Sequence, residues 1–299
     1  MTLMAVGPTG PAQPVTAPVT APAPAGSPVA DAYARLTAAY GGLRVTGLAA
    51  HEPSPRGAGW VGAHELAAGG EALEAFLAWD EAQVLRDYGR RARPDVVAGF
   101  GLHRYAWPAC LLITAPWFLD RRVPLLAPDQ VAFHRTEGRM AVRVESFACL
   151  PDDPAAVLPG ARVVPDAQAL REEVRAAVAG HLGPVLEGFA PRMRRGRRAL
   201  WAMATDEVVE GLWYLGQLLG GAEEHRAMRE LELLLPGATA PYTGGAGFRT
   251  LEGPGGRELA TRDRAGCCFF YTIRPEDTCV TCPRTCDAQR VTRLTAAAG

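Results

Sequence analysis

The stretch 264-RAGCCFFYTIRPEDTCVTCPRTC-286 decides how the C-terminal end of the chain folds, since it holds five of the seven cysteines of the 299-residue sequence. Four of them follow the spacing Cys-Cys-x10-Cys-x2-Cys, and Cys286 comes after three more residues. In a reducing compartment, clustered cysteines indicate metal or redox chemistry more often than structural disulfides. Cys110 and Cys149 stand alone among apolar residues, which is typical of buried core cysteines.

The two halves of this motif make different demands on the backbone. Successive side chains of an extended strand point to opposite faces, so Cys267 and Cys268 reach one centre only where the chain bends. Gly266 permits such a bend, because glycine adopts conformations that other residues avoid. The spacing Cys279-Val-Thr-Cys282 places two thiols on one side of a tight turn, an arrangement suited to holding one metal atom.

The spacing leaves several kinds of site open. A structural zinc site normally uses two Cys-x2-4-Cys knuckles, and an adjacent cysteine pair is a poor replacement for one of them. A disulfide scaffold is disfavoured by chain size and compartment, and the order of the spacings does not fit a radical-SAM motif. An iron–sulfur cluster held by four thiolates fits best. Spacing alone does not separate [2Fe–2S] from [4Fe–4S], because Cys279, Cys282 and Cys286 could supply three ligands of a cubane.

Upstream of the motif the sequence predicts mainly helices. Apolar residues recur at helical spacing after Asp166, a candidate N-cap, and again after Pro191. A third helix is expected from Ala222 to Leu235, and the glycine-rich residues 237–256 are expected to form a loop. The same periodicity assigns three aromatic residues to packing, namely Trp201, Trp213 and Tyr214.

The N-terminal half combines helices with short strands. Helices are expected over Asp31–Tyr40, over Glu71–Tyr88 and from Pro94 onwards, with Pro108 kinking or ending the last one. Strands are expected over Leu43–Leu48, Val131–Phe133, Met140–Ala148 and Arg162–Val164.

These elements predict an α+β fold in which a helix-rich C-terminal half packs with a small antiparallel sheet. Residues 1–28 hold seven prolines and no charged residue, so we expect a disordered Pro/Ala-rich tail there. The remainder divides into an N-terminal α+β region, 29–165, and a helical region that ends in the cysteine motif, 166–299.

The segment RAGCCFFYTIRPEDTCVTCP (264–283) closely resembles the C-terminal signature of the FhuF-type siderophore-iron reductases. The likeness includes the cysteine pair, the ten-residue gap, an aromatic strand over 269–271 and the final Cys-x2-Cys. The helix RRALWAMATDEVVEGLWYLGQ (197–217) is similar to one in that family and in the C-terminal region of IucA/IucC-type siderophore synthetases. The resemblance extends over residues from about 166 to 294.

The resemblance implies that a [2Fe–2S] cluster is held by Cys267, Cys268, Cys279 and Cys282, with Cys286 outside this set. It implies an oxidoreductase of iron transport, a ferric-siderophore reductase. Such a protein reduces chelated Fe(III) to Fe(II) by one electron, which releases the iron because the ferrous ion is held more weakly. The alternative is a non-catalytic iron–sulfur or structural zinc protein that accompanies a siderophore pathway.

The expected partners are a ferric siderophore and an external electron donor, either a ferredoxin or a flavin reductase. A separate donor is needed because the sequence shows no FAD or NAD fingerprint. An arginine-rich segment is expected to dock an anionic siderophore or an acidic donor. The alternative is that the segment is a solvated helix face. Its residues are Arg194, Arg195, Arg197 and Arg198. Four further arginines flank the cysteines and either donate to their sulfurs or are ordinary surface charges: Arg257, Arg262, Arg264 and Arg274.

Composition excludes several other functions. Thirty-one basic residues balance thirty-two acidic ones, which argues against a nucleic-acid binder. All the basic residues are arginine, so the chain has no P-loop and no lysine nucleophile. The six histidines show no pair at ligand spacing and are expected to be structural.

The expected location is the cytoplasm, with loose attachment to the inner face of the membrane as a second option. The longest apolar stretch, Trp107–Leu119, is shorter than the roughly 20 residues needed to span a bilayer, and it contains two prolines. The N-terminus lacks the charged start and compact apolar region of a signal peptide.

Overall fold

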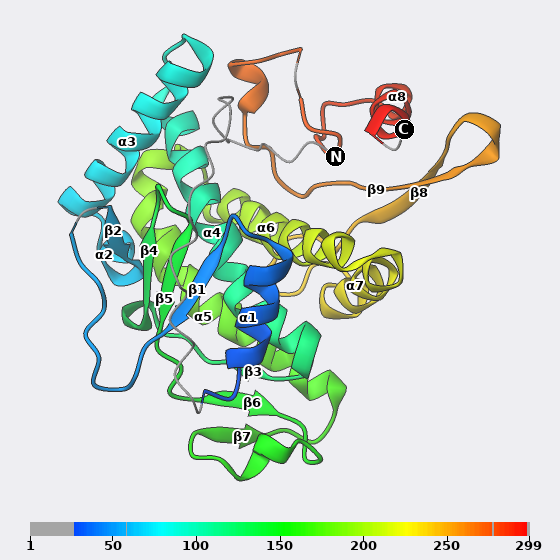
Figure 1. The fold of residues 1–299 in the computed structure, drawn as a ribbon. Coiled ribbons are helices and arrows are strands. Elements are labelled where there is room, and N and C mark those ends of the chain that lie inside the picture. Colours follow the sequence, from blue (N-terminus) through cyan, green and yellow to red (C-terminus); the bar gives the residue numbers. More distant parts are fainter. Residues whose placement is uncertain (1–26, 58, 277, 298–299) are drawn as a thin grey trace, which may run out of the picture.

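The computed structural model describes residues 27–57, 59–276 and 278–297, and it confirms the α+β fold class (Figure 1). The predicted tail, 1–28, lies outside the described residues except for its last two positions. The helices are α1 (Ala30–Ala39), α2 (Ala63–Ala68), α3 (Gly70–Tyr88), α4 (Pro94–Asp120), α5 (Ala167–Met193), α6 (Arg197–Leu219), α7 (Gly221–Leu234) and α8 (Asp287–Ala297). The strands are β1 (Arg44–Gly47), β2 (Trp60–Gly62), β3 (Val123–Pro124), β4 (Val131–His134), β5 (Arg139–Val142), β6 (Phe147–Cys149), β7 (Ala161–Val163), β8 (Phe248–Glu252) and β9 (Glu258–Arg262).

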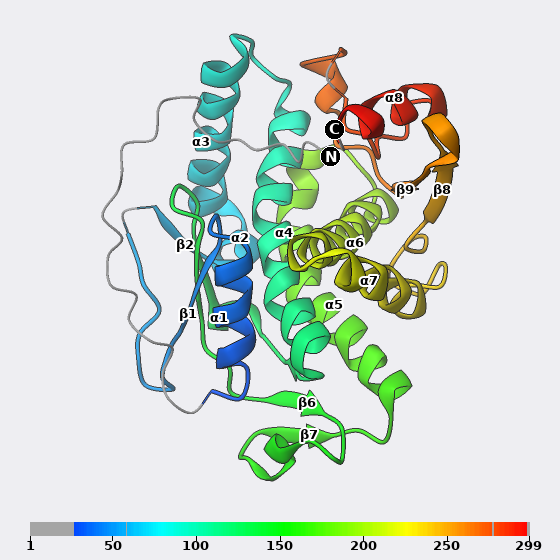
Figure 2. The same cartoon turned by 45° about the vertical axis from the view of Figure 1, so that its right-hand side comes forward.

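Helix α4 occupies the centre of the fold, between α3 and the pair α5 and α6 (Figure 2). Contrary to the expectation from uninterrupted apolar runs, it is long and apolar enough to cross a membrane by length and composition. However, 89% of its most apolar window is buried inside the fold. This burial is what the core helix of a globular protein shows, and nothing in the described residues supports attachment to a membrane.

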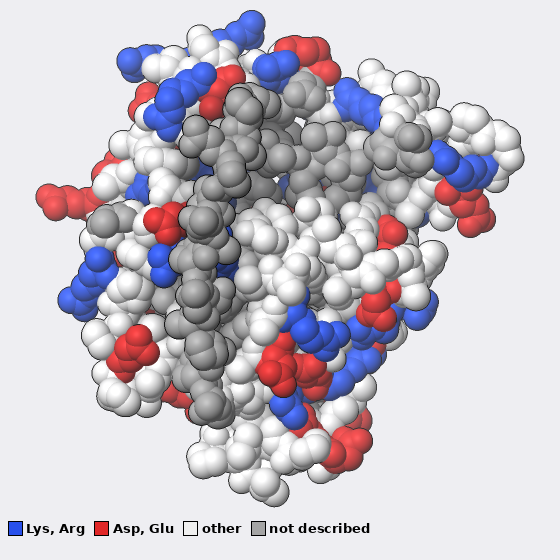
Figure 3. All heavy atoms as spheres, in the orientation of Figure 1, with Lys and Arg blue, Asp and Glu red and all other residues white. Residues whose placement is uncertain are grey.

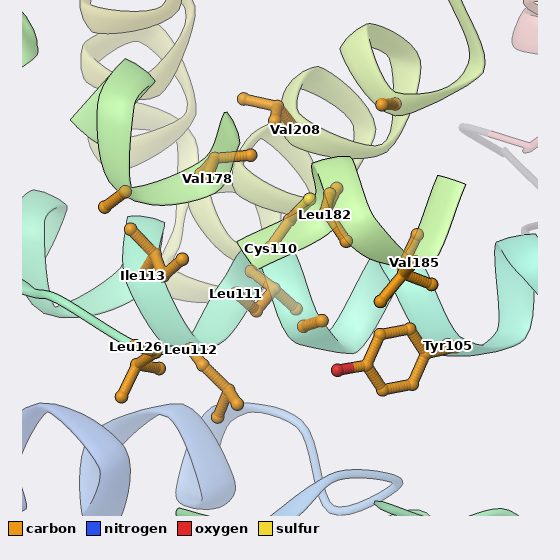
Figure 4. Packing of buried hydrophobic residues seen from close by; sticks show 14 of the residues in the cluster. Tyr105, Cys110, Leu111, Leu112, Ile113, Leu126, Val178, Leu182, Val185 and Val208 are labelled. Atoms are coloured by element: carbon orange, nitrogen blue, oxygen red, sulfur yellow. The ribbon is translucent and has the colours of Figure 1, made fainter. Parts of the chain in front are cut away.

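The prediction that Pro108 kinks or ends this helix is wrong in its stronger form, because α4 continues through Pro108 and Pro116 to Asp120. A proline inside a helix removes a backbone hydrogen bond and costs about 3 kcal/mol. The residues between the two prolines are buried, and Figure 4 shows Cys110 beside Leu182 of α5. Burial of this apolar surface offsets the cost and keeps the segment helical.

The strands form two small mixed sheets and one hairpin. The largest sheet has the order β1-β5-β4-β2. Its strands β4 and β5 are antiparallel as predicted, and β2, which was not predicted, is antiparallel to β4. Strand β1 pairs with β5 in parallel. The single strand expected over Met140–Ala148 is in fact two, because β5 ends at Val142 and β6 joins a second sheet, β3-β6-β7. Alternation along one segment does not reveal that the chain crosses between sheets.

The helices of the C-terminal half follow the prediction closely. Asp166 caps α5 as expected, since its side chain accepts a hydrogen bond of 2.9 Å from the Ala169 N–H. The boundary expected at Pro191 lies slightly later, after Met193, where Arg194 adopts a left-handed conformation with φ 49°. The loop expected over residues 237–256 is partly wrong, because it contains β8, which pairs with β9.

Buried hydrophobic side chains form one main cluster that extends from Val29 to Ala246. It holds residues from both sides of position 165, so the division into regions 29–165 and 166–299 stays a prediction. Cys110, Trp201 and Trp213 belong to this core as expected, and Cys149 is fully buried in a smaller cluster.

Charged side chains are spread over the surface, in keeping with the net charge of −1. On the face shown in Figure 3, acidic and basic side chains are interspersed. Exposed ion pairs such as Arg35–Asp120 (3.3 Å) and Arg91–Glu81 (3.7 Å) contribute little individually, because water screens them.

His181 is a structural histidine, as predicted, and it makes stability depend on pH. The ring lies between the Tyr105 hydroxyl (2.7 Å) and the Leu126 carbonyl (3.1 Å), and burial lowers its pKa from 6.5 to about 4. Below pH 6.5 the unfolded chain therefore binds more protons than the folded chain. As pH falls from 6.5 to 4, we expect the free energy of unfolding to decrease by up to about 3 kcal/mol.

Urea denaturation at several pH values measures this dependence. The matched variant is His181→Gln, which keeps a polar side chain at this position but does not titrate. The free energy of unfolding of this variant should depend less on pH between 6.5 and 4. An unchanged pH dependence would contradict the conclusion that it arises from His181.

Candidate functional site

Four of the five C-terminal cysteines line one small cavity of about 70 Å³, namely Cys267, Cys268, Cys279 and Cys282. The first pair follows β9, and the second lies in the loop that leads to α8. Other walls come from α4 and α6, through Phe100, His103, Trp107 and Glu210. Cys286 is exposed and does not line this cavity.

The cavity holds its thiols in two pairs. Within the described part of the chain, no three His, Cys, Asp or Glu side chains come close enough to hold a single metal ion. A tetrahedral zinc site would need four ligands around one point, whereas two irons can each take two of the four thiolates. Four thiols in two pairs are the number of protein ligands that a dinuclear iron–sulfur centre takes.

The segment before the first pair is fixed against α6. Asp206 is fully buried, and its carboxylate accepts hydrogen bonds from the Ala265 N–H (2.9 Å) and the Gly266 N–H (2.7 Å). A Cβ added at Gly266 would lie 3.1 Å from Asp206 Oδ2 and 3.2 Å from the backbone nitrogen of Met203. Glycine thus serves close packing here, in addition to any freedom it gives the backbone.

The chain bends at Ala265 and Gly266, as expected, and it turns again three residues later. Phe269 has φ 60°, a left-handed conformation that is uncommon for a bulky residue. The chain turns there into a short 3-10 helix, Phe270–Thr272, in place of the aromatic strand implied by the family resemblance. As a result the Phe269 N–H points back to Cys267 Sγ at 3.4 Å.

The second pair sits in a tight turn, as its spacing predicts. The Cys282 N–H donates to the Cys279 carbonyl at 3.1 Å, and the Arg284 N–H lies 3.5 Å from Cys282 Sγ. Arg290 is almost completely buried and donates to the carbonyls of Cys282 (3.2 Å) and Thr285 (3.1 Å). These contacts tie the turn to the start of α8.

The pKa values of the thiols depend on contacts with one another and with a neighbouring arginine. A hydrogen bond from Cys279 lowers the pKa of Cys282 to about 6, and the same bond raises the pKa of Cys279. Burial raises the pKa of Cys268, while the positive charge of Arg264 opposes this effect. Arg264 Nη1 lies 3.9 Å from Cys279 Sγ, so one of the flanking arginines does face a sulfur.

Arg264 belongs to a buried ionic network beneath the cysteines. Arg262 is fully buried and pairs with Asp206 (2.8 Å) and Glu210 (3.0 Å). Burial works against the charge of Arg264, but Asp206 and Glu210 raise its pKa, so this side chain stays charged. Glu210 also accepts a hydrogen bond of 2.9 Å from Thr281, which lies between Cys279 and Cys282.

The structure separates the four arginines that were predicted to act together in docking. Arg195 reaches the site, where it donates to the Cys267 carbonyl (2.7 Å) and stacks on Phe269, 3.9 Å from the ring centre. Arg194 forms the left-handed end of α5, and Arg197 and Arg198 are exposed at the start of α6. Only Arg195 therefore contacts the cysteine segment directly.

No pattern in the sequence indicates that α4 contributes to the site. Of its residues that line the cavity, His103 is expected to be structural. The structure places His103 in the cavity wall, where its Nδ1 lies 2.8 Å from the carboxylate of Glu207 on α6. This pairing joins residues 104 positions apart, so no local pattern could have revealed it.

Comparison with known families agrees with this geometry. Residues 264–284 match the family model of the FhuF 2Fe-2S C-terminal domain. This match confirms the resemblance seen in the cysteine motif, and it ends before Cys286. No curated protein matches the chain.

The cofactor of a FhuF 2Fe-2S domain is a [2Fe–2S] cluster, and the residues present suit it. Four soft sulfur donors face one cavity, and backbone N–H groups point at the sulfurs of Cys267 and Cys282. Hydrogen bonds to sulfur and partial burial are the means by which proteins adjust the reduction potential of such clusters. The match does not include α6, so the likeness to siderophore synthetases stays a prediction.

Loss of the Arg264 charge should lower the reduction potential of the cluster. Reduction adds a negative charge, which a cation near Cys279 Sγ stabilises. We expect the Arg264→Gln variant to show a midpoint potential lower by tens of millivolts in an anaerobic redox titration followed by visible absorption. Arg257→Gln removes an exposed arginine of the same region and should leave the potential nearly unchanged. Equal shifts in both variants would contradict a specific role for Arg264.

Proposed function

We propose that this protein is a [2Fe–2S] ferric-siderophore reductase whose cluster is held by Cys267, Cys268, Cys279 and Cys282. The observation that carries the proposal is the convergence of these four thiols on one cavity within a segment that matches the FhuF 2Fe-2S domain. Cys286 lies outside both the cavity and the match, which supports its exclusion from the ligand set.

The reaction transfers one electron to the chelated metal. A [2Fe–2S] cluster supplies a one-electron reductant, and the substrate Fe(III) chelate becomes the Fe(II) chelate. Ferrous iron binds hard oxygen ligands more weakly, so it passes to other acceptors. Outer-sphere electron transfer needs no acid–base pair. The chain's own residues are proposed to hold the cluster, shield it from bulk water and bring the chelate close.

The proposed setting is the cytoplasm, where a ferredoxin or a flavin reductase would return the electron to the cluster. Arg195 supports a docking role for the arginine-rich segment. Two of its guanidinium nitrogens are buried without a hydrogen-bond partner among the described residues, so they are free to bind an acidic group of a partner. Arg194, Arg197 and Arg198 are proposed as docking residues at the exposed end of the same segment.

The test uses full-length protein purified without oxygen. Iron, zinc and acid-labile sulfide are measured first, together with EPR spectra before and after dithionite. The proposal expects two irons and two sulfides per chain, with an EPR signal that appears on reduction. Protein reduced in this way and freed of dithionite is then mixed with a ferric siderophore. Reoxidation with formation of one Fe(II) per cluster supports the reductase, whereas a cluster that stays reduced favours a non-catalytic accessory protein. One zinc without sulfide would overturn the redox assignment.

A further inference from the structure

A second and larger cavity lies beside the cysteine cavity. Its volume is about 530 Å³, within the usual range for small-molecule sites. It is bounded by α3, by α4, by the turn between β4 and β5, and by Tyr40 after α1. Apart from Tyr214, every lining residue belongs to the N-terminal region, 29–165. The cysteine motif lies outside this region and gives no information about its function.

One stripe of α4 separates the two cavities. Phe100, His103 and Trp107 line both of them, and their spacing places them on one face of the helix. Trp107 is held by edge contacts with Tyr40 and a tilted contact with Tyr214, at ring-centre distances of 5.5 and 5.9 Å. The side chains of Phe100, His103 and Trp107 therefore form a wall, one side chain thick, between the two cavities.

The walls of the larger cavity are already fixed in position. Arg104 donates to Asp80 at 2.7 Å and lies over the Trp79 ring at 4.7 Å. Arg135 stacks on Phe76 at 4.4 Å and donates to the Phe76 carbonyl at 2.7 Å. Such a preformed cavity loses little side-chain freedom when a ligand enters.

The lining combines flat aromatic surface with a few charged groups. Tyr40, Trp107 and Tyr214 form an aromatic cluster at one side. The same lining also holds two cations, Arg104 and Arg135, and two acids, Asp87 and Glu137. This chemistry suits a bulky, partly apolar organic ligand that carries polar metal-binding groups, which is the composition of a ferric chelate.

We propose that this cavity, the α4 cleft, binds the ferric siderophore, and that the electron reaches the chelate across Phe100, His103 and Trp107. The inference rests on the proposed function, because it assumes that a chelate accepts the electron. It assigns the N-terminal region to substrate binding and the C-terminal motif to electron storage. A cluster held by the four cysteines would supply one electron, which would convert Fe(III) in the cleft to Fe(II), and Phe100, His103 and Trp107 would hold the chelate apart from the cysteines.

The binding test uses full-length protein with its oxidised cluster and redox-inert gallium(III) complexes of one tris-hydroxamate and one tris-catecholate siderophore. Gallium(III) forms complexes of the same charge and shape as ferric iron but does not accept the electron. Calorimetry should detect saturable binding of at least one complex. Thr136→Trp and Gln83→Trp each add a large side chain to the lining, from the β4–β5 turn and from α3, and each should weaken binding by at least about tenfold.

The control variant is Thr250→Trp, on the exposed face of β8 and outside the lining of the cleft. Its affinity should equal that of the unmodified protein. Binding of neither gallium complex, or equal affinities in all four proteins, would overturn the assignment of the cleft. Visible spectra report whether each variant keeps its cluster.

Reoxidation kinetics separate this inference from the proposed function. In stopped-flow mixing with the ferric complexes, the two cleft variants should need higher chelate concentrations for half-maximal rate. If the unmodified protein is reoxidised and the cleft variants match it, the cleft assignment fails while the reductase stands. If the unmodified protein binds the gallium complex in a cleft-dependent way but is not reoxidised by the ferric complex, the reductase fails while the binding site stands.

Discussion

A Cys282→Ser variant should lose the visible absorption and EPR signal of the cluster, while a Cys286→Ser variant keeps both. Cys282 lines the cavity and receives the Arg284 N–H at its sulfur, whereas Cys286 is exposed and lies outside the lining. Serine replaces a soft thiolate by a hard oxygen, which binds iron–sulfur centres poorly. Iron and sulfide analysis of the two anaerobically purified variants gives the measurement.

Cys110→Ser provides a second control, because Cys110 is a fully buried core cysteine far along the sequence from the motif. The folded Cys110→Ser variant should contain as much iron as the unmodified protein. A Cys286→Ser variant that loses its colour would exclude the proposed ligand set. It would indicate a cluster that uses Cys286, the arrangement that spacing alone left open.

Replacement of Asp206 by alanine should be the most destabilising change among the charged residues of the site. Its fully buried carboxylate pairs with Arg262 at 2.8 Å and accepts the N–H groups of Ala265 and Gly266. Alanine would leave the Arg262 guanidinium buried with fewer partners, and removal of one member of a buried ion pair costs about 3–5 kcal/mol. We expect the thermal midpoint to fall by roughly 10 °C.

Circular dichroism of the anaerobic, cluster-loaded protein measures this midpoint. Glu258→Ala is the matched control, because it removes an exposed carboxylate from β9, the strand that ends at Arg262. Its midpoint should change by a degree or two at most. The Asp206 variant should also lose its cluster faster on standing, since Asp206 fixes the segment just before Cys267. Equal midpoints in the two variants would contradict the buried network.

Much of the site could be predicted from short-range patterns. Cys279 and Cys282 lie in the tight turn that their spacing requires, and the Asp166 cap and the helix that follows it were evident from composition and periodicity. The failures share one cause. Pro108 stays helical because residues distant in the sequence bury α4 on all sides, and β8 forms because it pairs with β9 across a glycine-rich turn.

The sequence by itself determined the α+β class and the cysteine motif, because helix periodicity and ligand spacing are properties of neighbouring residues. The [2Fe–2S] cofactor followed from the likeness of this motif to a known family, since spacing alone left a [4Fe–4S] cluster open. Only the tertiary structure decided what surrounds the cysteines. It brought Asp206 under the first pair, turned the chain at Phe269, and placed His103 and Trp107 between the cysteine cavity and the α4 cleft. Such contacts join residues about 60 to 180 positions apart, and packing of whole helices sets them, which no local pattern encodes.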